Sequence, residues 1–105
     1  MNTATLHISR KIADQKEDKG DMQFIEGDYF NIYHAMIVSE KLGENNEMIK
    51  KFTAFKIDSI SDNSVNIKLI YPAPPTKDFS LKIGDSKEVE FGEYGIYTIT
   101  LSEVL

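Results

Sequence analysis

The sequence contains no cysteine and no tryptophan, and Arg10 is its only arginine. The lack of cysteine excludes disulfides, thiolate metal sites and cysteine nucleophiles, so stability has to come from packing. A single arginine leaves almost no capacity for bidentate recognition of phosphate or guanine, because lysine supplies charge without a planar fork. We therefore expect no direct binding of nucleic acid, and the net charge of −5 supports this expectation.

Long hydrophobic runs are also missing. No stretch approaches the roughly 20 apolar residues that span a bilayer, so we expect no association with a membrane. The first five residues lack the basic start and apolar run of a signal peptide, although a fragment without its leader would look the same. The default expectation is a cytoplasmic protein, and the sequence does not indicate an oligomeric state.

Catalytic and cofactor-binding motifs are lacking as well. The chain has no Gly-x-Ser-x-Gly, His-Glu-x-x-His, P-loop or Gly-x-Gly-x-x-Gly sequence. His7 and His34 are the only histidines; His7 is interpreted as an exposed residue on the polar face of a strand and His34 as a packed core residue. The sequence therefore predicts no enzymatic activity, no catalytic residue and no cofactor, although two carboxylates brought together by folding would still permit an enzyme.

The residues that are present indicate one globular domain. Hydrophobic residues make up 41% of the chain and charged residues 28%, which is close to the globular average. A chain of 105 residues is too short to divide into two parts with dependable cores. We therefore predict a single domain over residues 1–105.

Alternation of apolar and polar residues predicts most of the secondary structure. The predicted strands cover residues 3–13, 57–60, 65–71, 79–83, 88–91 and 97–101. Turn-forming residues at Ser61–Ser64 and Gly92–Gly95 are expected to close two hairpins, and the glutamates and threonines of the second would form one polar sheet face. The acidic segment 14–28 has few apolar residues and is predicted to be a long loop with room for one short strand.

Two interpretations remain open for the middle of the chain. Tyr29–Val38 has apolar residues at helical spacing, with Asp28 as a candidate N-cap and Gly43 as a candidate stop. The same segment is rich in aromatic and β-branched residues, which is typical of a strand covered on both faces. The predicted fold is mainly β, a small antiparallel β-sandwich or barrel of about six to seven strands. The alternative is an α+β fold with one or two helices within residues 28–56.

A calcium site in the acidic segment fails on its spacing. When Gly20 takes the sixth position of a calcium-binding loop, Glu26 takes the twelfth, but Gln15 and Lys19 then occupy positions that require oxygen ligands with negative charge. The charges are interpreted as a solvated segment, and no metal site is predicted.

Two segments are predicted to take part in interactions. Tyr71, Pro74 and Pro75 belong to a proline-rich stretch that favours an extended, docking-competent conformation, although it also fits a stiff link between hairpins. The second segment combines the carboxylates of Glu88, Glu90 and Glu93 with the aromatic ring of Tyr94. Its charges can steer a basic partner, or can simply protect an edge hairpin from aggregation.

These observations favour a non-enzymatic binding protein, such as a small acidic inhibitor, immunity factor or regulatory subunit that contacts a basic protein. A nucleic-acid mimic is a minor form of this hypothesis, because a charge of −5 is modest for that role. The alternative is a β-barrel that binds a small molecule in a cavity. Its candidate lining residues are Tyr29, Tyr33, His34 and Tyr97.

Overall fold

The part of the chain that the structure describes forms nine β-strands and one short 3-10 helix. The computed structural model describes residues 2–33, 35–39, 52–70 and 78–105. The strands are β1 (Ala4–Ile12), β2 (Gln15–Phe24), β3 (Tyr29–Asn31), β4 (Met36–Val38), β5 (Thr53–Ile60), β6 (Ser64–Leu69), β7 (Phe79–Lys82), β8 (Ser86–Glu90) and β9 (Ile96–Val104), and η1 (Gly92–Tyr94) is the 3-10 helix.

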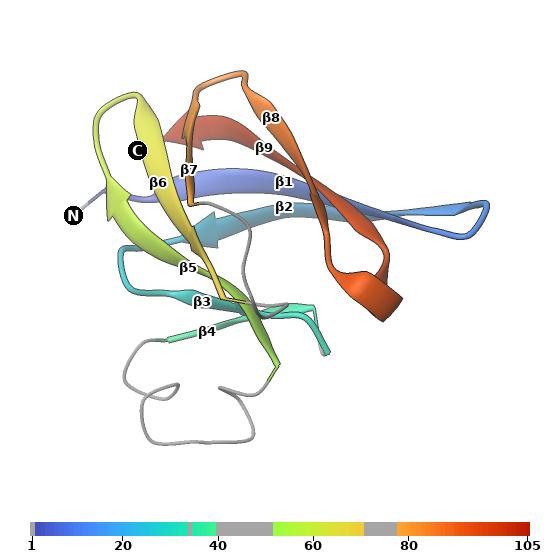
Figure 1. Ribbon diagram of the computed structural model, residues 1–105. Coiled ribbons are helices and arrows are strands. Elements are labelled where there is room, and N and C mark those ends of the chain that lie inside the picture. Colours follow the sequence, from blue (N-terminus) through green and yellow to red (C-terminus); the bar gives the residue numbers. More distant parts are fainter. Residues whose placement is uncertain (1, 34, 40–51, 71–77) are drawn as a thin grey trace.

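The strands form two antiparallel sheets that pack on each other as a small β-sandwich (Figure 1). One sheet has the order β2-β1-β9-β8 and the other has the order β4-β3-β5-β6-β7. The predicted fold class is therefore confirmed, but the predicted six to seven strands were too few. The extra strands are β2 and the three-residue strands β3 and β4, which are too short to show a clear alternation.

The open question about residues 28–56 is resolved for the part that the structure describes. Tyr29–Asn31 and Met36–Val38 pair with each other as antiparallel strands, and β3 also pairs with β5. None of the described residues in this range belongs to an α-helix. Residues 40–51, including the candidate stop Gly43, lie outside the described residues, as does His34.

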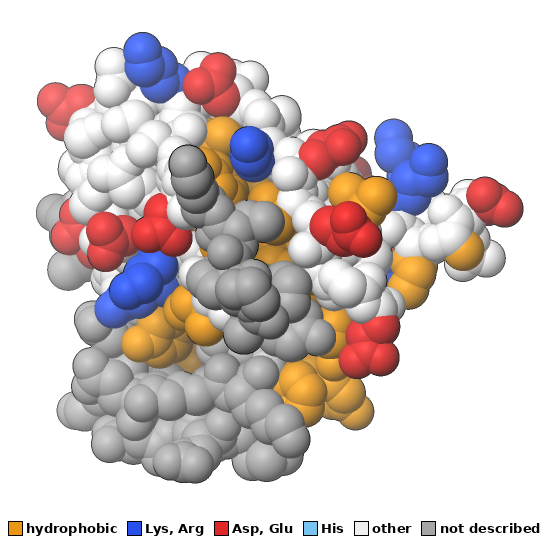
Figure 2. All heavy atoms as spheres, in the orientation of Figure 1, with side chains coloured by type: hydrophobic (Ala, Val, Ile, Leu, Met, Phe, Trp, Pro, Cys, Tyr) orange, Lys and Arg blue, Asp and Glu red, His pale blue; other side chains and the backbone are white. Residues whose placement is uncertain are grey.

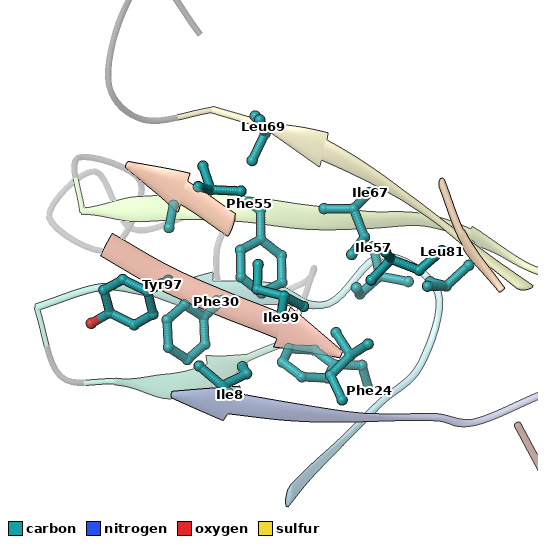
Figure 3. Close-up of a cluster of buried hydrophobic side chains, with 14 of the residues drawn as sticks. Ile8, Phe24, Phe30, Phe55, Ile57, Ile67, Leu69, Leu81, Tyr97 and Ile99 are labelled. Atoms are coloured by element: carbon teal, nitrogen blue, oxygen red, sulfur yellow. The ribbon is translucent and has the colours of Figure 1, made fainter. Parts of the chain in front are cut away.

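The core lies between the sheets and is filled by aromatic and aliphatic side chains (Figure 3). The ring of Phe55 stacks on that of Phe30 at a centroid distance of 5.1 Å and lies 5.9 Å from that of Phe24. Tyr97 continues the cluster, with its ring 6.0 Å from Phe30 and 5.4 Å from Phe91. All five rings are fully buried. Phe24 and Tyr97 belong to one sheet and Phe30 and Phe55 to the other, so this cluster joins both sheets.

The prediction of a loop over residues 14–28 was wrong for most of the segment. Gln15–Phe24 is a ten-residue edge strand that pairs with β1 along its length, and the β1–β2 hairpin projects beyond the rest of the sandwich (Figure 1). A projecting edge strand buries little surface, so its sequence needs few apolar residues. A bulge at Lys19 also shifts the alternation, and Gly20 beside it has a φ of +81°.

The two predicted hairpins are confirmed. β5 and β6 flank the turn at Ser61, and β8 and β9 flank η1. In the second hairpin Glu88 lies opposite Thr98, so the predicted polar face of glutamates and threonines is formed. The first predicted strand, residues 3–13, agrees with β1.

Candidate functional site: the polar face of the four-stranded sheet

The four-stranded sheet presents one face to the core and one to solvent. Inward positions of β1 and β9 are apolar and buried, whereas the alternate positions carry hydroxyl, imidazole and carboxylate groups. We call the outward set the polar sheet face. It includes Asp18 and Asp21 of β2, His7 and Ser9 of β1, Thr98 and Thr100 of β9, and Ser86, Glu88 and Glu90 of β8. Lys11 and Lys16 lie on the same side of the sheet, next to the turn of the β1–β2 hairpin.

His7 is held between two aspartates of β2. Its Nδ1 lies 2.7 Å from Oδ1 of Asp21, and its Nε2 lies 3.1 Å from Oδ1 of Asp18. Carboxylates only accept hydrogen bonds, so both contacts are hydrogen bonds only when both ring nitrogens carry a proton. The hydrogen bond to Asp21 is the main cause that raises the pKa of His7 above 6.5, against the opposing effect of burial. The arrangement therefore favours an imidazolium ion.

We expect the contribution of His7 to the free energy of unfolding to depend on pH. Because its folded-state pKa is raised, the stabilisation is fully present below the unfolded-state pKa of 6.5 and is lost as the pH rises through the folded-state value. The side chain is 40% exposed, so solvent screening limits the effect to a few tenths of a kcal/mol, at most about 1. An NMR titration of the His7 ring and urea unfolding at about pH 5.5 and about pH 8.5 would measure it.

The control for this titration is Asp21→Asn, which removes the main cause of the shift and keeps the size of the side chain. Its His7 pKa is expected to fall relative to the wild type, and its stability should change less between the two pH values. An unchanged His7 pKa in this variant would show that the contact with Asp21 does not form in solution.

Hydroxyl groups occupy the centre of the polar sheet face. Oγ of Ser86 and Oγ1 of Thr100 are 2.6 Å apart, and Ser9 lies opposite Thr98 in the β1–β9 register. A hydroxyl becomes a useful nucleophile when a base accepts its proton. In this structure both nitrogens of His7 face carboxylates, so neither is directed to a hydroxyl. The geometry is suited to hydrogen bonding with another surface.

The predicted acidic cluster lies along the β8 edge of this face and at its end. Glu88 and Glu90 are outward residues of the edge strand, and Glu93 is exposed in η1. None of the three forms an ion pair with any residue that the structure describes. Tyr94, the aromatic residue of this predicted segment, is half-buried and packs against the core, so only part of its ring is open to a partner.

Three further predicted site residues belong to the proline-rich stretch. Tyr71, Pro74 and Pro75 lie outside the described residues.

The tyrosines of the alternative hypothesis are separated in the fold. Tyr97 is fully buried in the core, whereas Tyr29 faces outward from the five-stranded sheet and Tyr33 is 61% exposed beyond the end of β3. The fourth candidate, His34, is outside the described residues. The described tyrosines therefore do not line a common cavity.

Sequence reasoning missed a charged group near the turn of the β1–β2 hairpin. Nη2 of Arg10 lies 2.8 Å from Oε1 of Glu17, and Nζ of Lys19 lies 2.7 Å from Oε2 of the same carboxylate. These two cations lower the pKa of Glu17. Arg10 also lies opposite Tyr97, and burial raises the pKa of that phenol. Figure 3 shows the hydroxyl of Tyr97 at one end of the buried cluster.

The chain was compared with protein-family models, curated proteins and solved structures, and none of them matched it. Within the described ranges, no group of three or more histidine or acidic side chains is arranged to hold a metal ion. The same residues include no helix that is long and apolar enough to cross a membrane. The class of protein is thus given by the fold, a small antiparallel β-sandwich with a polar, partly acidic outer face.

Proposed function

We propose that this protein is a non-enzymatic binding protein of the cytoplasm that acts as an inhibitor, immunity factor or regulatory subunit. It binds a basic protein partner through the polar sheet face. The observation that carries the proposal is the acidic β8 edge, where Glu88 and Glu90 are exposed and form no ion pair with any described residue.

The distribution of charge on this face supports a basic partner. Glu88 and Glu90 line one edge of the sheet, and Asp18 and Asp21 line the other around His7. Carboxylates at both edges attract a positively charged surface over a distance of about 10 Å and orient it during the encounter. The hydroxyl groups between the edges can then donate and accept hydrogen bonds.

The shape of the site favours a protein over a small molecule as ligand. A sheet face offers an extended surface, whereas small ligands generally need a concave site that covers most of their area. The competing explanation is that the glutamates only protect β8 from pairing with another strand. The two explanations make different predictions for partner binding when the glutamates are neutralised: the first predicts weaker binding, and the second predicts no change.

The wild-type protein is expected to capture a salt-sensitive partner from source-cell lysate. The double variant E88Q/E90Q should capture only a small part of that amount. Neutralising two rim carboxylates mainly slows association and reduces the salt dependence of binding. The measurement is quantitative affinity capture at low and high salt, with wild type and variant side by side.

The matched control is D14N/D62N, which removes the same number of charges from exposed positions in the β1–β2 and β5–β6 turns. It should capture the same partner as the wild type. Absence of any salt-sensitive partner, or equal losses in both variants, would contradict the proposal. Aggregation of E88Q/E90Q with unchanged partner capture would favour the protective role.

A further inference from the structure

The opposite outer face of the sandwich carries a cross-strand row of one aromatic and two cationic side chains. Tyr29 of β3 lies opposite Lys56 of β5, and Lys56 lies opposite Lys68 of β6. All three project outward, because the neighbouring pairs Phe30–Phe55 and Phe55–Leu69 point into the core. This row is on the sheet that does not contribute to the polar sheet face.

The row lines an open hollow of about 300 Å³, together with Thr53 and Ile70. Tyr29 is only 9% exposed although it faces outward, so its ring is sunk into the surface. Nζ of Lys56 lies 5.5 Å from the centroid of that ring, and the side chain of Ile70 is 36% exposed. Figure 2 shows a blue patch of Lys or Arg side chains in the region of β3 and β5, with hydrophobic side chains on one side of it and acidic ones on the other.

Two lysines lie opposite each other at this hollow, and Asp58 and Asp78 line a neighbouring pocket together with Lys68. Like charges directly opposite each other on paired strands destabilise a sheet, yet Lys56 and Lys68 take such positions. Lys68 forms no ion pair with any described residue, although the chain as a whole carries a net charge of −5. Two cations and an apolar floor are the groups that would recognise an anion with an apolar body.

We propose that this hollow binds a small organic anion, whose phosphate or carboxylate lies between Lys56 and Lys68 while its apolar part contacts Tyr29 and Ile70. The volume of the hollow is at the lower end of the range for ligand sites, so the ligand has the size of a single substituted ring. The site is independent of the polar sheet face, because the residues of the two sites lie on different sheets.

The test uses the full chain and four probes, which are phenyl phosphate, benzoate, phenol and inorganic phosphate. Two-dimensional NMR is expected to show saturable shifts for the amides of Tyr29, Lys56 and Ile70 with phenyl phosphate or benzoate. Whichever of phenyl phosphate and benzoate binds more tightly shows whether the site prefers a phosphate or a carboxylate. Phenol lacks the anionic group and inorganic phosphate lacks the apolar ring. Each should therefore bind at least roughly tenfold more weakly than the better of the two organic anions. The proposal is overturned if neither organic anion produces saturable shifts at these residues, or if inorganic phosphate binds as tightly as phenyl phosphate.

Variants of Lys68 separate a binding role from a general role in solubility. Lys68→Gln should weaken binding of the better probe by roughly tenfold, whereas Lys68→Arg should retain it within about threefold. The control is Lys82→Gln, an exposed lysine of β7 that does not line the hollow. Equal affinity of Lys68→Gln and wild type would overturn the proposal. Capture of a basic partner by the polar sheet face should be the same in all three variants, so the two proposals can fail separately.

Discussion

Replacement of Phe55 by alanine should lower the free energy of unfolding by about 3 to 5 kcal/mol, the usual range for a buried phenylalanine. Phe55 is fully buried and its ring contacts those of Phe24 and Phe30, so the substitution leaves a cavity where the two sheets meet. The neighbouring rings belong to different strands and cannot fill the space without moving the backbone. Urea unfolding followed by circular dichroism would measure the loss.

The control for this experiment is Ile83→Ala, because Ile83 is 48% exposed and lies beyond the end of β7. Its expected loss is less than about 1 kcal/mol. Small domains have a total stability of only about 5 to 15 kcal/mol, so Phe55→Ala can unfold a large fraction of the protein. Phe55→Leu keeps most of the volume and should remain measurable, with a smaller loss. Similar losses for Phe55→Ala and Ile83→Ala would show that the aromatic cluster is not the centre of the core.

Replacement of Gly95 by alanine is expected to cost about 3 kcal/mol, since it combines backbone strain with a collision. Gly95 follows η1 with φ of 92° and ψ of −166°, a conformation that residues with a Cβ atom rarely adopt. An added Cβ would also lie 2.5 Å from the carbonyl oxygen of Lys11 in β1. The substitution therefore pushes β1 away from the start of β9.

Gly84→Ala separates these two causes. Gly84 has φ of +94°, but an added Cβ would meet no atom within 4 Å, so only the backbone strain of about 1 to 2 kcal/mol is expected. Thermal and urea unfolding of both variants would give the difference, which measures the collision with Lys11. Equal losses would mean that β1 yields easily at this point.

The C-terminal half of the fold could be predicted from sequence because its alternation is regular and its turns are marked. Val65 and Ile67 point into the core between polar neighbours, and Gly92 and Gly95 mark the turn between β8 and β9. β2 could not be recognised, because most of its side chains face water and its bulge interrupts the period. The strand is defined by its backbone pairing with β1, which hydrophobic patterning does not report.

The candidate sites were predictable to different degrees. The side of β8 on which Glu88 and Glu90 lie follows from the local hairpin, so the sequence alone placed them on a polar face. The contact of His7 with Asp21 depends on the register of the unrecognised hairpin. The hollow beside Lys68 requires the order of three strands, and no local pattern contains that information.

The pairing of β1 with β9 has a consequence for when the polar sheet face exists. These strands are adjacent at the centre of the four-stranded sheet, and Thr3 and Leu105 exchange two backbone hydrogen bonds of 2.8 Å. Hairpins such as β5–β6 close short loops, whereas joining β1 to β9 closes a loop of almost the whole chain and carries the largest entropic cost. The surface that combines His7 with Thr100 is therefore assembled only when both ends of the sequence have come together. A partially folded chain that retains only local hairpins would lack the complete polar sheet face.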